Sequence, residues 1–270
     1  MPEAWMDHNL KVILEERRKR WAERDHTAAV DRGRLLEYLE HFPVRLERGS
    51  FESFVGGLPD SYVRRFAPKE IIQHYLSFRH YQPGQTVTIL SPLEQRWALT
   101  LLTGDHPFLL AQISGTLALY ELNILEAEAF THPEGIVLDH FLIQDGNGYL
   151  RDEERRRKLQ VSLEKDGLTG SPLKSLPARS PAGGPCQILG QNVPELSTTL
   201  LSVECPDRIG LLFEIASAIS EKGCDISSAY IETNNDRVHD IFLITRQGQP
   251  LDASALSEVK DHLTRALGGK

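Results

Sequence analysis

The stretch DRIGLLFEI, residues 207–215, decides the fold because the chain contains its pattern twice. The earlier stretch DHPFLLAQI, residues 105–113, has apolar, acidic and turn-forming residues at matching places. At the same offset, residues 122–131 align with residues 224–233. The second copy then lacks one residue, after which residues 137–143 align with residues 238–244. Two long copies of this kind indicate a duplicated domain rather than a solenoid.

Each copy predicts the same order of elements: strand, amphipathic helix, two strands joined by a hairpin, and a closing helix. In the second copy these elements are expected at 198–203, 211–219, 226–233, 238–245 and 253–267. Asp252 is expected to cap the closing helix. With a final strand that is short or displaced, this order is the split βαβ pattern of ferredoxin-like α+β sandwiches (βαββαβ). Such a unit leaves a sheet face or edge uncovered, so the two copies are expected to pack as a pair.

The remaining sequence predicts a helical N-terminal segment and a linker. Helical spacing of apolar residues predicts helices within the first fifty residues and at 68–78, and alternation predicts a strand at 85–90. Gly, Pro and Ser are concentrated between the copies, which is typical of a linker or a long surface loop. The expected division is a helical region at 1–90, a first copy at 91–165, a linker at 166–195 and a second copy at 196–270.

Composition excludes several classes of function. The 30 Lys and Arg residues against 38 Asp and Glu give a net charge of −8, which argues against nucleic acid as a partner. No apolar run approaches the length of a membrane span and no signal peptide is visible, so no membrane partner is expected. Cys186, Cys205 and Cys224 are too few for a disulfide framework or a zinc site, and Cys205 is expected to be a small buried hydrophobe. A reducing, cytoplasmic location is the natural interpretation.

The turn from the first strand into the helix of the second copy is the best candidate site. A helix N-terminus offers unpaired backbone N–H groups and a partial positive charge. Gly210 allows a ligand to approach the backbone, and Asp207 can accept a hydrogen bond from an ammonium group. These features suit a zwitterion, and Asp225 is expected near the same ridge. The alternative interpretation is an ordinary helix cap and a glycine required for packing.

The pattern Asp-Arg-x-Gly-Leu-Leu, followed by an apolar helix and then by Val-x-Asp-x-Phe, resembles the ACT domain, a small-molecule-binding regulatory module. The tandem copies, with FVGGLPDSY at 54–62 and FAPKEI at 66–71, resemble the C-terminal part of bacterial PII uridylyltransferase/uridylyl-removing enzymes. In that family, paired ACT domains sense glutamine and control two catalytic domains. The resemblance implies that an amino acid is contacted by Asp207, Arg208, Ile209, Gly210, Leu211 and Asp225 in the second copy and by Asp105, His106 and Asn123 in the first.

The sequence departs from the family in its turns and in its catalytic parts. The first copy has Phe108 where glycine is usual and His106 where arginine is usual, and the second has Ile209 in place of proline. We find no turn with spaced aspartates that could hold Mg²⁺ for nucleotidyl transfer. The His239-Asp240 dipeptide has no companion histidines at metal-ligand spacing and is interpreted as part of a strand. The expectation is therefore no catalytic residue, no metal and no cofactor.

These observations predict a non-catalytic regulatory protein that binds an amino acid resembling glutamine and acts in nitrogen or amino-acid regulation. Expected partners are the small effector, a second copy of the chain through the ACT domains, and a regulated enzyme or PII-type protein. One alternative is a fragment or separate regulatory half of a PII uridylyltransferase that acts with a catalytic chain. Another is that both sites are vestigial and the domains only mediate dimerisation.

Overall fold

The computed structural model describes residues 32–43, 46–94, 96–166, 184–234 and 237–268. The chain divides into two compact units, residues 1–79 and 80–270, and each is described by itself. The helix expected within the first thirty-one residues and most of the expected linker lie outside the described residues. None of the described helices combines the length and the apolar character that a membrane span requires.

The first unit is helical, as the sequence predicts. Its helices are α2 (Arg32–Glu40), α3 (Arg48–Gly56), α4 (Asp60–Arg65) and α5 (Pro68–His80). Their apolar faces meet in an aromatic core in which Phe51 and Tyr75 stack edge to face with ring centroids 5.1 Å apart. Tyr62 and His74 share a buried hydrogen bond of 2.9 Å, and burial lowers the pKa of His74 to about 4. This histidine is therefore neutral at physiological pH.

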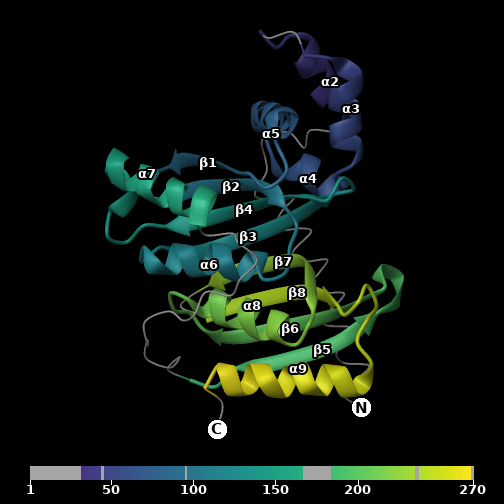
Figure 1. Ribbon diagram of the computed structural model, residues 1–270, viewed down its shortest axis with the longest axis vertical. Coiled ribbons are helices and arrows are strands. Elements are labelled where there is room, and N and C mark those ends of the chain that lie inside the picture. Colours follow the sequence, from purple (N-terminus) through teal and green to yellow (C-terminus); the bar gives the residue numbers. More distant parts are fainter. Residues whose placement is uncertain (1–31, 44–45, 95, 167–183, 235–236, 269–270) are drawn as a thin grey trace. The chain divides into compact units, whose positions relative to one another are not determined.

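The second unit contains both copies of the repeat (Figure 1). The first copy consists of β1 (Thr86–Leu93), β2 (Arg96–Gly104), α6 (Leu109–Leu119), β3 (Asn123–His132), β4 (Ile136–Gln144) and α7 (Glu153–Val161). The second consists of β5 (Gln187–Val193), β6 (Thr198–Pro206), α8 (Leu211–Glu221), β7 (Asp225–Asn234), β8 (Arg237–Thr245) and α9 (Ala253–Ala266). Short turns of 3₁₀ or π helix lie at Tyr149–Arg151, Ser162–Asp166 and Pro194–Leu196.

The two copies form one antiparallel sheet of eight strands in the order β1-β2-β4-β3-β7-β8-β6-β5. The copies join where β3 pairs with β7, with Ala127 opposite Ile231 (Figure 1). Helices α6 and α8 pack against each other, so the apolar side chains of both copies form one continuous core. The expectation that the copies pack as a pair is thus confirmed within a single chain.

The edge strand of each copy differs from the order that the sequence predicts. The strand beside β2 is β1 and the strand beside β6 is β5, so each edge strand precedes its copy instead of following the closing helix. The order of strands in the sheet is that of the ferredoxin-like fold. The place of the expected final strand of each copy is taken by the strand that precedes the copy, β1 or β5. Strand β5 lies inside 166–195, where we expected only a linker, and that part of the expectation is wrong. A short strand containing glycine and asparagine owes its conformation to pairing with β6 rather than to its own propensity.

The cysteines also differ from expectation. Cys186 and Cys205 form a disulfide that ties the residue before β5 to β6. Cys205 is fully buried, as expected, but it is a bonded half-cystine rather than a free thiol. Cys224 is free and buried. The two half-cystines are nineteen residues apart and meet here because β5 pairs with β6, so sequence spacing gave no indication of this bond.

Gly190 is required by the close approach of α9 to β5. A Cβ atom at this position would lie 2.7 Å from Leu256 Cδ1 and 2.9 Å from Leu201 Cδ2. We predict that Gly190→Ala lowers the free energy of unfolding by about 1–3 kcal/mol through overpacking. Gly146→Ala is the matched control, because a Cβ there meets no atom within 4 Å, and its effect should stay within about 0.5 kcal/mol. Urea denaturation measures both, and equal effects would contradict the packing argument.

Candidate functional site

Two equivalent loops lead from the inner strands into helices α6 and α8. The residue before α8 is Gly210 and the residue before α6 is Phe108, and both have left-handed backbone conformations, with φ of 88° and 65°. The backbone bonds around them correspond closely: Glu214 N donates to the Gly210 carbonyl over 3.2 Å, and Gln112 N donates to the Phe108 carbonyl over 2.9 Å. The repeat is therefore preserved in the conformation of the loop, although the residues differ.

Neither α6 nor α8 has a side-chain cap, unlike the closing helices of the two copies. Asp152 accepts a hydrogen bond from Arg155 N at the start of α7 (2.9 Å), and Asp252 accepts one from Ala255 N at the start of α9 (2.8 Å). The expected cap at Asp252 is thus confirmed. No side chain caps α8, although Asp207 precedes it. The first-turn N–H groups of α8 consequently lack the acceptor that an ordinary cap would supply.

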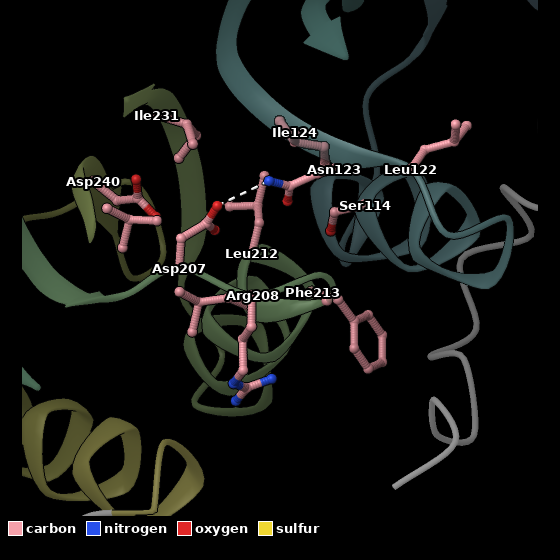
Figure 2. A pocket seen from close by; sticks show the side chains of 13 residues that line it. Ser114, Leu122, Asn123, Ile124, Asp207, Arg208, Leu212, Phe213, Ile231 and Asp240 are labelled. Atoms are coloured by element: carbon pink, nitrogen blue, oxygen red, sulfur yellow. Dashed lines mark hydrogen bonds between the residues drawn. The ribbon is translucent and has the colours of Figure 1, made fainter. Parts of the chain in front are cut away.

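The carboxylate of Asp207 instead bonds to the other copy. Asn123 Nδ2 donates to Asp207 Oδ2 over 2.8 Å (Figure 2). Asn123 is the first residue of β3, while Asp207 follows β6, so the hydrogen bond crosses from one copy to the other. These two residues, both predicted to be ligand contacts from separate halves of the repeat, are brought together by the structure.

A cavity of about 20 Å³ lies at this contact, which is room for about one water molecule. Polar and apolar side chains of both copies line it (Figure 2). The lining residues are Ser114, Leu122, Asn123 and Ile124 from the first copy, and Asp207, Arg208, Gly210, Leu211, Leu212, Phe213, Ile231, Val238 and Asp240 from the second. The cavity therefore lies beside the hydrogen bond between Asn123 and Asp207, and side chains of both copies contribute to its wall.

Arg208 is held by its own helix. Its guanidinium makes two hydrogen bonds to the Glu214 carboxylate, one of them 2.7 Å long. Figure 2 shows the guanidinium pointing away from Asp207. Arg208 therefore contributes its stem to the cavity wall, while its charge is paired with Glu214. Ile209, also predicted from the resemblance, does not line the cavity.

Asp225 lies near the other loop, which corrects its expected position. Asp225 lies opposite Thr245 at one end of β8, whereas Pro206, which precedes Asp207, lies opposite Arg237 at the other end. The charge of Asp225 acts on Asp105 in the first copy. Burial, above all, raises the pKa of Asp105; Asp225 raises it further and His106 lowers it. The sheet thus creates a reciprocal arrangement: Asn123 of the first copy meets the loop of the second, and Asp225 of the second interacts with the loop of the first.

Two buried carboxyl groups were not recognised as site residues from the sequence. Asp139 on β4 and Asp240 on β8 occupy equivalent places and are 3% and 1% exposed. Asp240 lines the cavity. The available signal was an acidic residue at the same position of both copies within an apolar strand. Such a residue, on the face where its neighbours are apolar, is expected to be buried.

Burial, and secondarily the charge of Asp105, raises the pKa of Asp139 to about 8. Its pKa in an unfolded chain is about 3.9, so between these values the native state holds one more proton than the unfolded state. The native state therefore loses stability as pH rises through this window, by up to about 1.4 kcal/mol per pH unit.

We predict that Asp139→Asn, which has no such proton, gains stability relative to the wild type between pH 5 and pH 8. Urea unfolding at several pH values measures the difference. A constant difference across this range would show that Asp139 ionises normally.

The sheet is built from two copies of a ferredoxin-like unit, each with a loop that leads into its first helix. Residues 199–263 match the model of the ACT domain family. The sequence is similar to the "bifunctional uridylyltransferase/uridylyl-removing enzyme" of several bacteria. Identity is 30% over 221 residues in Gluconobacter oxydans, 72% of this chain and 23% of that protein. In Bradyrhizobium diazoefficiens it is 28% over 264 residues, 89% of this chain and 28% of that protein.

The chain thus spans about a quarter of the length of these relatives. Among solved structures, the aspartate kinase from Synechocystis matches with 17% sequence identity and a TM-score of 0.40, over 64% of this chain and 28% of that one. Within the described ranges, no group of three or more His, Cys, Asp or Glu side chains is arranged to hold a metal ion.

Proposed function

We propose that this chain is a non-catalytic regulatory protein that binds an amino acid, glutamine or a close analogue, across the junction of its two ACT copies. The observation that carries the proposal is the hydrogen bond from Asn123 to Asp207. It directs the Asp207 carboxylate to the other copy, and Gly210, the N-cap residue of α8, has no side chain that could cap the first turn. An ordinary capping role for Asp207 would have produced the opposite arrangement.

The chemistry of these groups suits a zwitterion with a polar side chain. Asp207 accepts hydrogen bonds from the ligand's ammonium group, and the first-turn N–H groups of α8 donate to its carboxylate. Gly210 keeps the approach to those N–H groups free of a side chain. Asn123, which can both donate and accept, pairs with the side-chain amide of a glutamine-like ligand.

Binding replaces a direct contact between the copies with a bridge through the ligand. The cavity of about 20 Å³ must widen to admit an amino acid, so Asn123 and Asp207 separate as the ligand enters. The protein then has two arrangements with different affinities for the ligand, which is the requirement for a regulatory response. Because β3 and β7 belong to one sheet, the change is felt in both copies.

A more specific role is regulation of a uridylyltransferase catalytic chain. The observation that favours it is the similarity to bifunctional uridylyltransferase/uridylyl-removing enzymes, of which this chain spans about a quarter. On this proposal the partners are that catalytic chain or a PII-type protein, and the setting is nitrogen regulation in the cytoplasm. Copurification with a nucleotidyltransferase chain tests this role, and a chain that recovers none would exclude it.

We predict that Asp207→Ala weakens glutamine affinity by about ten- to a hundred-fold, the usual effect of losing a charge-assisted hydrogen bond. Asp105→Ala should have a much smaller effect, because Phe108 occupies the place of Gly210 in that loop. Calorimetric titration of both variants measures the difference.

Two further variants test whether the site crosses between the copies. Asn123→Ala should resemble Asp207→Ala, and Asp225→Ala should resemble Asp105→Ala. Equal losses in all four would mean that both loops share one site, and a larger loss for Asp105→Ala would place the ligand at the first loop. Absence of binding for all twenty amino acids would favour domains that only mediate association.

We also predict that this chain alone does not transfer uridylyl groups. It is incubated with UTP, Mg²⁺ and a PII protein, with the Gluconobacter oxydans enzyme as the positive control. Transfer that is lost when residues of this chain are mutated would contradict the non-catalytic assignment.

A further inference from the structure

The disulfide lies next to the loop that carries Asp207, although the proposed function does not use the disulfide. Strand β5 pairs with β6 in the register Gln187 opposite Glu204, which places Cys186 opposite Cys205 on the next rung. The Cα atoms of the two cysteines are 4.5 Å apart. Pro206 and Asp207 follow Cys205 directly, so the bond holds the strand end from which the Asp207 loop starts.

The two sulfur atoms differ in accessibility. Cys205 is fully buried in the shared core, whereas Cys186 is partly exposed at the edge of the sheet. A thiolate arriving from solvent can therefore attack Cys186 and not Cys205. Cys205, once released, sits among apolar side chains that favour its neutral thiol form.

The segment before β5 lies against the loop. A Cβ atom on Gly184 would be 3.2 Å from Pro206 Cγ, so the backbone at Gly184 passes close to the proline ring. Strand β5 has only β6 as a neighbour in the sheet. Backbone hydrogen bonds hold Gln187–Val193, but the residues before them are tied to the loop by the disulfide.

We propose that Cys186 and Cys205 form a reversible thiol–disulfide site, and that its reduction releases residues 184–186 and loosens the loop that carries Asp207. A thiolate of a cellular dithiol attacks Cys186 Sγ, the S–S bond breaks, and Cys205 leaves and takes up a proton. The second thiol of the reductant then resolves the mixed disulfide and frees the Cys186 thiol. Two electrons and two protons pass from the dithiol, which becomes a disulfide, to the protein.

Amide hydrogen exchange with and without dithiothreitol tests this proposal. Reduction should speed exchange several-fold in peptides covering 184–186 and 205–210. The equivalent loop at 103–108 is the internal control, because the first copy has Thr103 in the position of Cys205 and lacks the bond. Cys186→Ser should exchange rapidly without reductant, and Cys224→Ser, which removes the free cysteine, should behave as the wild type.

Several outcomes would overturn the proposal. Equal exchange in both redox forms would show that the bond does not restrain the loop. Faster exchange throughout the chain would make the disulfide a general structural support. Failure of the reduced protein to reform the bond with glutathione disulfide would exclude reversibility.

Glutamine titration of both redox forms extends the test to regulation, and this arm alone rests on the proposed function. We expect the reduced form to bind more weakly, because a loosened loop must be ordered on binding. Equal affinities would overturn the link to the effector site. If neither form binds glutamine, the proposed function fails, and the exchange data decide the redox proposal separately.

Discussion

The pairing of β3 with β7 is the constraint on which the rest of the structure depends. Each copy taken alone would expose one of these strands as an unpaired edge. Joining them gives one sheet of eight strands and brings α6 against α8 over a common core. It also sets Asn123, at the start of β3, against the loop that follows β6. The same contact between strands thus stabilises the fold and assembles the candidate site.

The sequence alone was sufficient for the repeat, the inner strands and the helices of each copy. These elements have strong periodic patterns of apolar residues, and Asp252 caps the start of α9 as expected. It was not sufficient for β5, whose Gly190 is explained only by the approach of Leu256 from α9. Nor could it pair Cys186 with Cys205, since the pairing depends on strand register rather than on any local signal.

The site shows the same division between local and long-range information. Asp207 was recognisable at the turn from strand to helix and Asn123 through the family resemblance, but their partnership depends on how the copies meet. Asp225 has the same chemistry and was assigned to the wrong loop, because a repeat places equivalent residues in each copy without showing which copy they face. Arg208 had a competing acidic partner in the fourth residue of α8, Glu214, whose carboxylate pairs with its guanidinium.

The loops before α6 and α8 have the same backbone conformation but different residues, Phe108 and Gly210, at the position before the helix. Phe108 adopts a left-handed conformation that costs a residue with a Cβ roughly 1–2 kcal/mol. The chain tolerates this strain because the ring packs against the common core. Entry into the helix therefore fixes the conformation at both positions, but it does not require glycine. Gly210 leaves the start of α8 free of a side chain, whereas Phe108 places a ring there that packs against the core, and this difference is the reason why the proposed ligand site is assigned to the second loop.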